Sequence, residues 1–245
     1  MAGWKDRQNS FNGKIEGFED ISVDNFYDKT KKAYFLSHFH SDHYGGLIGK
    51  NGRHASDLME SEPKKKIYMT EPTRIIFSIH YPDDYNELEH IIVTLQTGQT
   101  YSNLDDLDID VTLQEVTHMP GAVMFIFAKP SWKVLYTGDF VMRTSGEEEL
   151  AELKSLHDED GNPLTFDYMY YDATFEEKPA LPTRAQCIEN VVPIIEDWLN
   201  LSEENFVVFM TYYDYAYEEL FAEISRHMEE KKIYIHDAKQ IDVYK

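Results

Sequence analysis

The feature that most constrains the fold is a short apolar segment that ends in a cluster of histidines. Residues 33–37 read A-Y-F-L-S, the composition of a buried strand, and the next six residues read H-F-H-S-D-H. His38 and His40 are two apart, so an extended chain points both side chains the same way. Asp42 and His43 then turn back toward the same point. Gathering three histidines and an aspartate at one point costs free energy unless a cation binds them. The cluster therefore favours a metal site over a histidine-rich surface loop.

Two more candidate ligands follow apolar runs further along the chain. His118 lies in T-H-M-P-G, and Asp139 ends Y-T-G-D. Taken alone, each is more typical of a turn. Together with the histidine cluster, both are expected to bind the metal, because each follows the end of a predicted strand.

Two further aspartates are candidates for supporting roles. Asp24, in I-S-V-D, is either a solvated turn residue or a carboxylate that orients a ligand loop or histidine. Asp172, in Y-D-A-T-F, has the same position at a strand end. His236 also ends a predicted strand and is a further candidate. The other histidines are expected to be surface or packing residues: His54, His80, His90, His157 and His227.

The apolar and β-branched runs predict a mixed α/β fold. Strands are expected at 33–37, 66–69, 91–96, 108–115, 123–128, 133–137 and 167–171. Helices are expected over 73–79, within the acidic stretch 147–157, and after the capping box that begins at Thr183, where Pro193 should kink the helix. The tail predicts strand 206–211, helix 217–228 and strand 232–236, a βαβ unit with parallel strands.

Composition restricts the classes of function. The 245 residues suffice for one large domain or for one domain plus part of another, and no apolar run is long enough to span a membrane. The first twelve residues are polar and lack the apolar stretch of a signal peptide, so none is expected there. The single cysteine, Cys187, indicates a reducing compartment and leaves histidine and carboxylate as metal ligands. The net charge of −22 argues against a nucleic-acid substrate unless basic residues gather locally, and the densest run, 64–66, is expected to be solvated.

The order of H-x-H-x-D-H, His118 and Asp139 resembles the metallo-β-lactamase superfamily. The stretches I-S-V-D-N-F, H-M-P-G-A-V-M-F-I-F, V-L-Y-T-G-D-F and Y-D-A-T-F are similar to its β-CASP branch, the SNM nucleases, as is the later Y-A-Y-E. The likeness runs from about Ile15 to the C-terminus. The chain departs from the family at Met119, Ala122 and Ala173, where cysteine, serine and threonine are usual.

The resemblance implies an αββα metallo-β-lactamase sandwich, incomplete, over residues 1–175 and the beginning of a β-CASP domain over 176–245. It implies that a zinc ion is held by His38, His40, His118 and Asp139. A second metal would use Asp42, His43 and Asp139 together with a histidine further along in the family, which is missing here. Asp24, Asp42, Asp139 and Asp172 are the implied catalytic acids.

The implied activity is zinc-dependent phosphodiester hydrolysis of single-stranded, hairpin or overhanging DNA ends, by an exonuclease or endonuclease of double-strand-break processing or cross-link repair. DNA, DNA-repair proteins as partners, no membrane, and a nuclear location follow from the same resemblance. Two alternatives stay open: hydrolysis of a small ester or thioester, and a catalytically incomplete fragment that acts only by binding.

Overall fold

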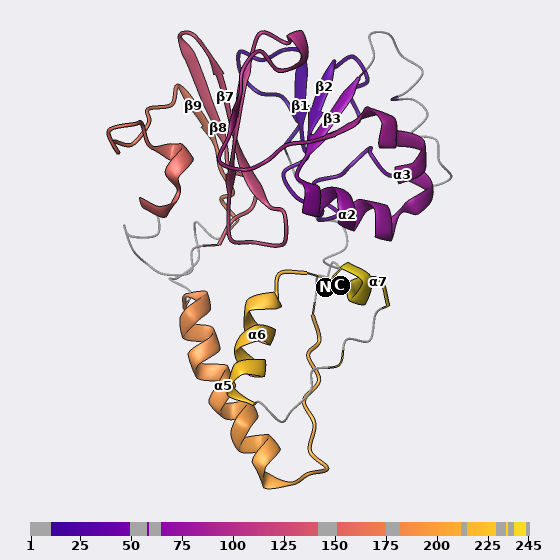
Figure 1. The fold of residues 1–245 in the computed structure, drawn as a ribbon, viewed down its shortest axis with the longest axis vertical. Coiled ribbons are helices and arrows are strands. Elements are labelled where there is room, and N and C mark those ends of the chain that lie inside the picture. The colour runs from indigo at the N-terminus through magenta and orange to yellow at the C-terminus, as the bar shows by residue number, and fades with distance from the viewer. Residues whose placement is uncertain are drawn as a thin grey trace.

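Two β-sheets stacked face to face form the upper part of the molecule in Figure 1, and two helices, α5 and α6, lie below them. The structure is a computed structural model that describes residues 11–49, 58, 65–141, 151–174, 182–211, 215–228, 234 and 238–243. The mixed α/β class predicted from the sequence is confirmed.

The first sheet consists of four parallel strands in chain order: β1 (Ile21–Val23), β2 (Ala33–Phe35), β3 (Lys66–Met69) and β4 (Ile92–Thr94). Strands β1 and β2 are buried at every position. A parallel sheet is covered on both faces, so its strands are continuous apolar runs rather than alternating ones. This explains why the strand at 66–69 was predicted with its observed bounds.

The second sheet has five strands in chain order: β5 (Thr100–Tyr101), β6 (Asp110–Glu115), β7 (Val123–Lys129), β8 (Trp132–Tyr136) and β9 (Tyr168–Tyr170). Neighbours are antiparallel except β8 and β9, which are parallel. Short 3-10 helices lie at Glu89–Ile91, Leu104–Asp106 and Lys154–Leu156.

Aromatic side chains fill the space between the two sheets. The ring of Phe35 on β2 lies 5.4 Å from that of Phe125 and 5.0 Å from that of Phe127, both edge-on from β7. All three side chains are fully buried. Such pairs add to the free energy gained by burial alone. Strand β2 is therefore firmly anchored, and so is the start of the histidine segment that follows it.

Helices α2 (Glu71–His80) and α3 (Pro82–Leu88) cover the outer face of the first sheet (Figure 1). Thr70 caps α2 by accepting a hydrogen bond from the backbone N–H of Thr73. Ile76 and Phe77 are the buried face of the helix. The helix predicted at 73–79 is confirmed, and it begins two residues earlier because of this cap.

Residues after 182 form a smaller helical part with its own apolar cluster. It contains α5 (Arg184–Leu201), α6 (Glu218–His227) and the short α7 (Ala238–Val243), which packs against α2. Helix α5 runs on through Pro193. The predicted boundary at 175/176 lies among residues outside the described ranges, so the two-domain division stays a prediction.

The tail differs from the predicted βαβ unit. Residues 206–211 are extended, but in the described part of the chain they belong to neither sheet. Val207 and Phe209 face α5 and α6, whereas Phe206, Val208 and Met210 are exposed. The alternation of a strand is present, but a strand also needs a backbone partner. The predicted strand at 232–236 lies outside the described residues apart from Tyr234.

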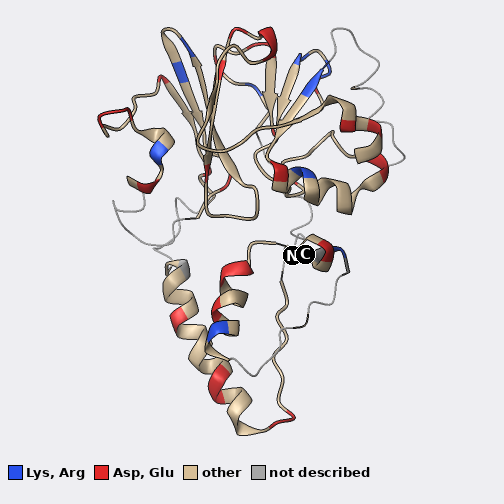
Figure 2. Cartoon of the chain, viewed as in Figure 1, with Lys and Arg blue, Asp and Glu red and all other residues tan. Residues whose placement is uncertain are grey.

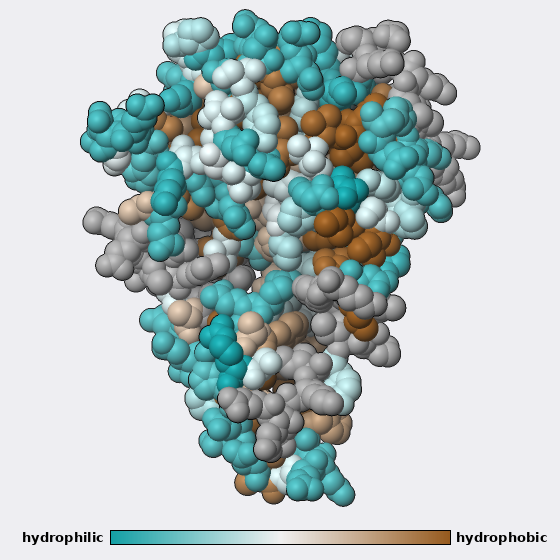
Figure 3. Space-filling model, viewed as in Figure 1, coloured by the Kyte–Doolittle hydropathy of each residue, from teal (hydrophilic) through white to brown (hydrophobic). Residues whose placement is uncertain are grey.

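The Lys and Arg residues of the described chain do not gather in one place. Figure 2 shows Lys and Arg at separate points, without a continuous basic band over the residues drawn in colour. Figure 3 shows hydrophobic residues in several separate patches on a face that is otherwise mostly hydrophilic. Among the described helices, none is both long enough and apolar enough to cross a membrane.

Candidate metal centre

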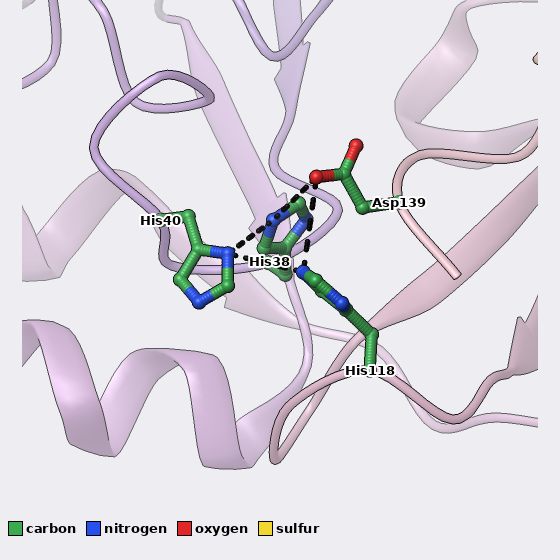
Figure 4. Close-up of side chains that lie close together, drawn as sticks. All are labelled: His38, His40, His118 and Asp139. Atoms are coloured by element: carbon green, nitrogen blue, oxygen red, sulfur yellow. Dashed lines mark hydrogen bonds and ion pairs between the residues drawn. The ribbon is translucent and has the colours of Figure 1, made fainter. Parts of the chain in front are cut away.

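Four side chains from three separate strand ends converge on one point (Figure 4). His38 and His40 follow β2, His118 follows β6, and Asp139 follows β8. One ligand atom from each lies within 4.8 Å of the others. The structure thus brings together the four residues that the sequence predicted as ligands of one metal.

The distances among these atoms match those of a tetrahedral metal site. His40 Nδ1 lies 3.2 Å from His38 Nε2 and 3.0 Å from His118 Nε2. Asp139 Oδ2 lies 3.9 Å and 3.8 Å from the same two Nε2 atoms. Zinc bonds of about 2.1 Å in tetrahedral geometry separate ligand atoms by about 3.4 Å. The observed distances lie on either side of this value, so the donor set fits a zinc ion.

The buried carboxylate of Asp24 accepts hydrogen bonds from residues that surround the centre. Its Oδ1 accepts from the backbone N–H of Ser37 at 2.7 Å. Its Oδ2 accepts from the Ser37 hydroxyl at 2.6 Å, from the Tyr136 hydroxyl at 2.8 Å, and from His43 Nδ1 at 2.8 Å. Asp24 is therefore not a solvated turn residue; it binds the histidine segment directly.

The Asp24 network fixes which ring nitrogen of His38 carries the proton. The Ser37 hydroxyl has one proton and donates it to Asp24, so toward His38 Nδ1, 3.0 Å away, it can only accept. His38 consequently carries its proton on Nδ1 and presents the lone pair of Nε2 to the centre. Such carboxylate-linked histidines are a general feature of metal sites.

A second cluster shares one residue with the first. Asp42, His43 and Asp139 each offer a ligand atom within the same 4.8 Å limit. His43 Nε2 lies 3.3 Å from Asp139 Oδ1 and 3.7 Å from Asp42 Oδ2. Asp139 thus directs Oδ2 toward the first cluster and Oδ1 toward the second, the arrangement of a carboxylate that can lie between two cations.

Burial and charge set the protonation of the histidines. Burial, assisted by the other histidines, lowers the pKa of His38 well below its usual range and that of His40 to about 3. Both are neutral at pH 7, the form that binds metal ions. Burial also lowers the pKa of His43, but the carboxylates of Asp24 and Asp139 outweigh it and raise that pKa well above the ordinary value.

The two acids of the second cluster have pKa values shifted in opposite directions. Burial raises the pKa of Asp42 and outweighs the attraction of His43. Burial is also the largest single influence on Asp139, but the hydrogen bond from His43 and the electrostatic attraction of the neighbouring histidines together outweigh it and lower the pKa of Asp139. Asp42 is consequently the better proton acceptor of the pair, and Asp139 the more firmly ionised ligand.

The turn that presents Asp139 depends on a glycine. Gly138 has a φ of +54°, and a Cβ there would lie 2.9 Å from the Ser37 hydroxyl oxygen. Beyond the turn, the N–H of Val141 donates to the carbonyl of Thr117 at 2.7 Å. This bond joins the Asp139 segment to the segment that carries His118.

Two further sequence candidates, Asp172 and His236, are not among the described residues that the structure brings together. Asp172 is exposed and accepts bonds from Thr174 in its own turn, and among the described residues it belongs to neither cluster. His236 lies outside the described ranges. Sequence reasoning missed Ser37 and Tyr136. Ser37 directly precedes His38 and Tyr136 lies three residues before Asp139, so the available signal is a hydroxyl close to a ligand at a strand end.

Comparison with known proteins gives relatives over nearly the whole chain. Protein artemis from Gallus gallus is 30% identical and that from Mus musculus 31%, each over 96% of this chain and 33% of its own length. The DNA cross-link repair protein PSO2/SNM1 of Saccharomyces cerevisiae is 31% identical over 66% of this chain and 24% of its own length. The chain is an Artemis-like member of the SNM family. No protein-family model matches it.

This SNM family member spans about a third of the length of the Artemis proteins it matches. Among solved structures, a protein of unknown function from Enterococcus faecalis V583 superposes with a TM-score of 0.55 and 18% identity. The match covers 86% of this chain and 48% of the other. It supports the fold alone, and the predicted metallo-β-lactamase fold is confirmed.

Proposed function

We propose that the chain carries the zinc-dependent centre of a DNA nuclease that hydrolyses phosphodiester bonds in DNA repair. The observation that carries the proposal is the convergence of His38, His40, His118 and Asp139 at tetrahedral spacing, in a chain whose relatives are Artemis and PSO2/SNM1. The family argues for DNA as the substrate and for a nuclear location with repair proteins as partners. Repair of cross-links is the role that the name of PSO2/SNM1 supports, and processing of double-strand breaks is the role implied by the resemblance of the sequence to the SNM nucleases.

The protein's own residues hold and orient the reacting groups. A zinc ion, when bound, would lower the pKa of a water molecule toward about 7 and polarise the phosphodiester. Asp139, 28% exposed at its side chain, lies where the centre opens to solvent and would orient that water. Asp42, whose pKa burial raises, is the proposed proton acceptor. Asp24 accepts the Nδ1 proton of His43, and the other ring nitrogen of His43, Nε2, faces Asp42 and Asp139.

The second cluster offers ligands for another metal ion beside the first. Asp42, His43 and Asp139 supply three ligands beside the first site, and Asp139 can serve both. A closed site usually needs four. We therefore propose one firmly bound zinc and a weaker second site.

The acidic surface favours a second candidate function. A net charge of −22 repels a phosphate backbone, and the Lys and Arg positions coloured on the cartoon in Figure 2 are scattered among acidic ones. A small ester or thioester would not meet this repulsion. The same centre can hydrolyse such substrates, because zinc polarises a carbonyl as it does a phosphoryl group.

The deciding experiment measures zinc content and hydrolysis on the same preparations. The parent, the double variant His38→Ala/His118→Ala and the control His90→Ala are compared, because His90 lies outside both clusters. Labelled single-stranded, hairpin and overhang DNA are offered beside a chromogenic ester. We expect about one zinc and DNA cleavage in the parent and control, and neither in the double variant.

Each other outcome has a defined meaning. A parent without zinc would contradict the metal centre itself. Zinc with ester turnover but no DNA cleavage would support the second candidate. Zinc without any turnover would indicate a chain that acts only by binding, the second alternative that the sequence left open. The ends of the labelled fragments separate exonuclease from endonuclease cleavage.

A further inference from the structure

The turn that carries His118 rests against the first residues of α2. The carbonyl oxygen of Gly121, three residues after His118, lies 2.8 Å from the hydroxyl oxygen of Thr70 and 3.3 Å from that of Thr73. The two hydroxyl oxygens are 2.9 Å apart. Both threonines are buried. A helix on the outer face of the first sheet thus contacts a turn that extends from the second sheet.

This contact is too close for any residue but glycine at position 121. Gly121 has a φ of +85°, in the left-handed region that favours glycine. A Cβ there would lie 2.6 Å from Thr73 Oγ1, 2.7 Å from Thr70 Oγ1 and 2.8 Å from the Thr73 nitrogen. The backbone of the turn is therefore pressed directly onto the helix start, without an intervening side chain.

The two hydroxyls act as a pair. Each has a single proton, and together they make three short contacts: two with the Gly121 carbonyl and one between themselves. If one hydroxyl is removed, the other still has a proton to donate to the carbonyl. Removing both leaves a partly buried carbonyl facing apolar methyl groups, which is costly.

The contact with α2 is one of several restraints on the turn, and it acts at the middle of the turn. Within the turn, the N–H of Ala122 donates to the carbonyl of Met119, and the N–H of Val116 donates to the carbonyl of Ala122. These bonds close the turn, and two more hold its ends: the N–H of Val123 donates to the Ser37 carbonyl beside His38, and the N–H of Val141 donates to the Thr117 carbonyl. Helix α2 packs on the sheet that contains β2, so a bond from α2 relates His118 to His38 and His40.

We infer that Thr70 and Thr73 are positioning residues of the metal centre: their hydroxyls hold the Gly121 carbonyl and thereby keep His118 at ligand distance from His38 and His40. The inference rests on the proposed metal centre. It assigns to α2 a role in metal affinity, in addition to its role in covering the sheet.

The test compares Co²⁺ affinity among hydroxyl variants. Thr70→Val/Thr73→Val removes both hydroxyls at nearly constant shape, and Thr70→Ser/Thr73→Ser retains them. Thr100→Val/Thr112→Val is the matched control, since this pair, 2.7 Å apart on β5 and β6, is exposed and bonds across strands. Competition titration followed by the visible absorption of bound Co²⁺ gives the dissociation constants. Outer partners of metal ligands typically change affinity about 10–100-fold.

The expected result is at least about tenfold weaker Co²⁺ binding in the double valine variant, about the parent's affinity in the double serine variant and the control, and a small change in each single valine variant. In metal-free protein, the ring signals of His118 in nitrogen-detected NMR spectra should shift most in the double valine variant, less in each single valine variant, and not in the double serine variant or the control.

Several outcomes would overturn the inference. One is parent-like affinity and unshifted His118 signals in the double valine variant. Another is an equal loss in the serine variant, because the hydroxyls would then be irrelevant. If the double valine variant does not fold, the single variants decide: parent-like Co²⁺ affinity together with an unshifted His118 signal in both Thr70→Val and Thr73→Val contradicts the role. A parent that binds no Co²⁺ contradicts the metal centre instead, while the NMR comparison still tests the positioning.

Discussion

Asp24 Oδ2 accepts the Nδ1 proton of His43 at 2.8 Å, and the same oxygen accepts from Ser37 and Tyr136. A single buried carboxylate thus holds two strand ends and the histidine segment in one arrangement. The Asp24 carboxylate determines which ring nitrogen carries the proton in His38, a residue of the first cluster, and in His43, a residue of the second.

Replacing Asp24 by asparagine should weaken metal binding about 10–100-fold. The amide oxygen of asparagine can still accept hydrogen bonds, but its NH₂ group cannot accept them and would lie against groups that donate to the carboxylate. Because the carboxylate is fully buried beside His43, the metal-free protein should lose about 3–5 kcal/mol of stability in urea unfolding. Asp20→Asn is the matched control: its ion pair with Lys32 is exposed and should matter little. Unchanged Co²⁺ affinity in Asp24→Asn would show that the carboxylate does not orient the ligands.

The hydroxyl of Tyr136 can be removed without disturbing its ring. Tyr136→Phe leaves Asp24 one donor short, so the free energy of unfolding should fall by about 1.5–3 kcal/mol. Metal affinity should fall less than in Asp24→Asn, because His43 and Ser37 keep their bonds. Tyr34→Phe is the control, since that hydroxyl donates to the Asp28 carbonyl away from the centre. Equal loss of affinity in both variants would contradict a specific role for Tyr136.

Adding zinc to chelator-treated protein should raise its thermal midpoint. A ligand that binds only the folded state stabilises it by about 2.7 kcal/mol at a hundred times its dissociation constant. The shift should grow with zinc concentration in the parent and in His90→Ala, and vanish in His38→Ala/His118→Ala, which lacks two of the four candidate ligands. A shift of equal size in the double variant would place the bound zinc elsewhere.

The four ligands of the candidate centre were predictable because each follows an apolar strand. Strand ends collect at the edge of a sheet, so residues far apart in sequence meet there. Ser37, Tyr136 and the pair Thr70 and Thr73 were missed, because a hydroxyl has no pattern of its own in the sequence. Its role depends on which carboxylate or carbonyl the fold places beside it.

The elements that the sequence predicted incorrectly are those that depend on a distant partner. Residues 206–211 alternate as a strand does, yet no described strand pairs with them. Strand β1 was not predicted, because only three residues pair and the middle one is Ser22, whose buried hydroxyl donates to the Asn25 carbonyl. Local composition indicates that a segment can extend, but pairing is decided by the rest of the fold.

Removing the N-cap of helix α5 should destabilise that helix and leave the metal centre unchanged. Thr183 accepts from the N–H of Gln186 at 3.2 Å, and the Gln186 side chain accepts from the Thr183 N–H at 2.9 Å. Thr183→Ala removes the first bond and should cost about 1 kcal/mol. The cluster around Ile188 and Ile224 is separate from the sandwich core, so hydrogen exchange should quicken in α5 and α6 and stay constant in β2 and β7. Equal acceleration in the sheets would mean that both parts unfold as one unit.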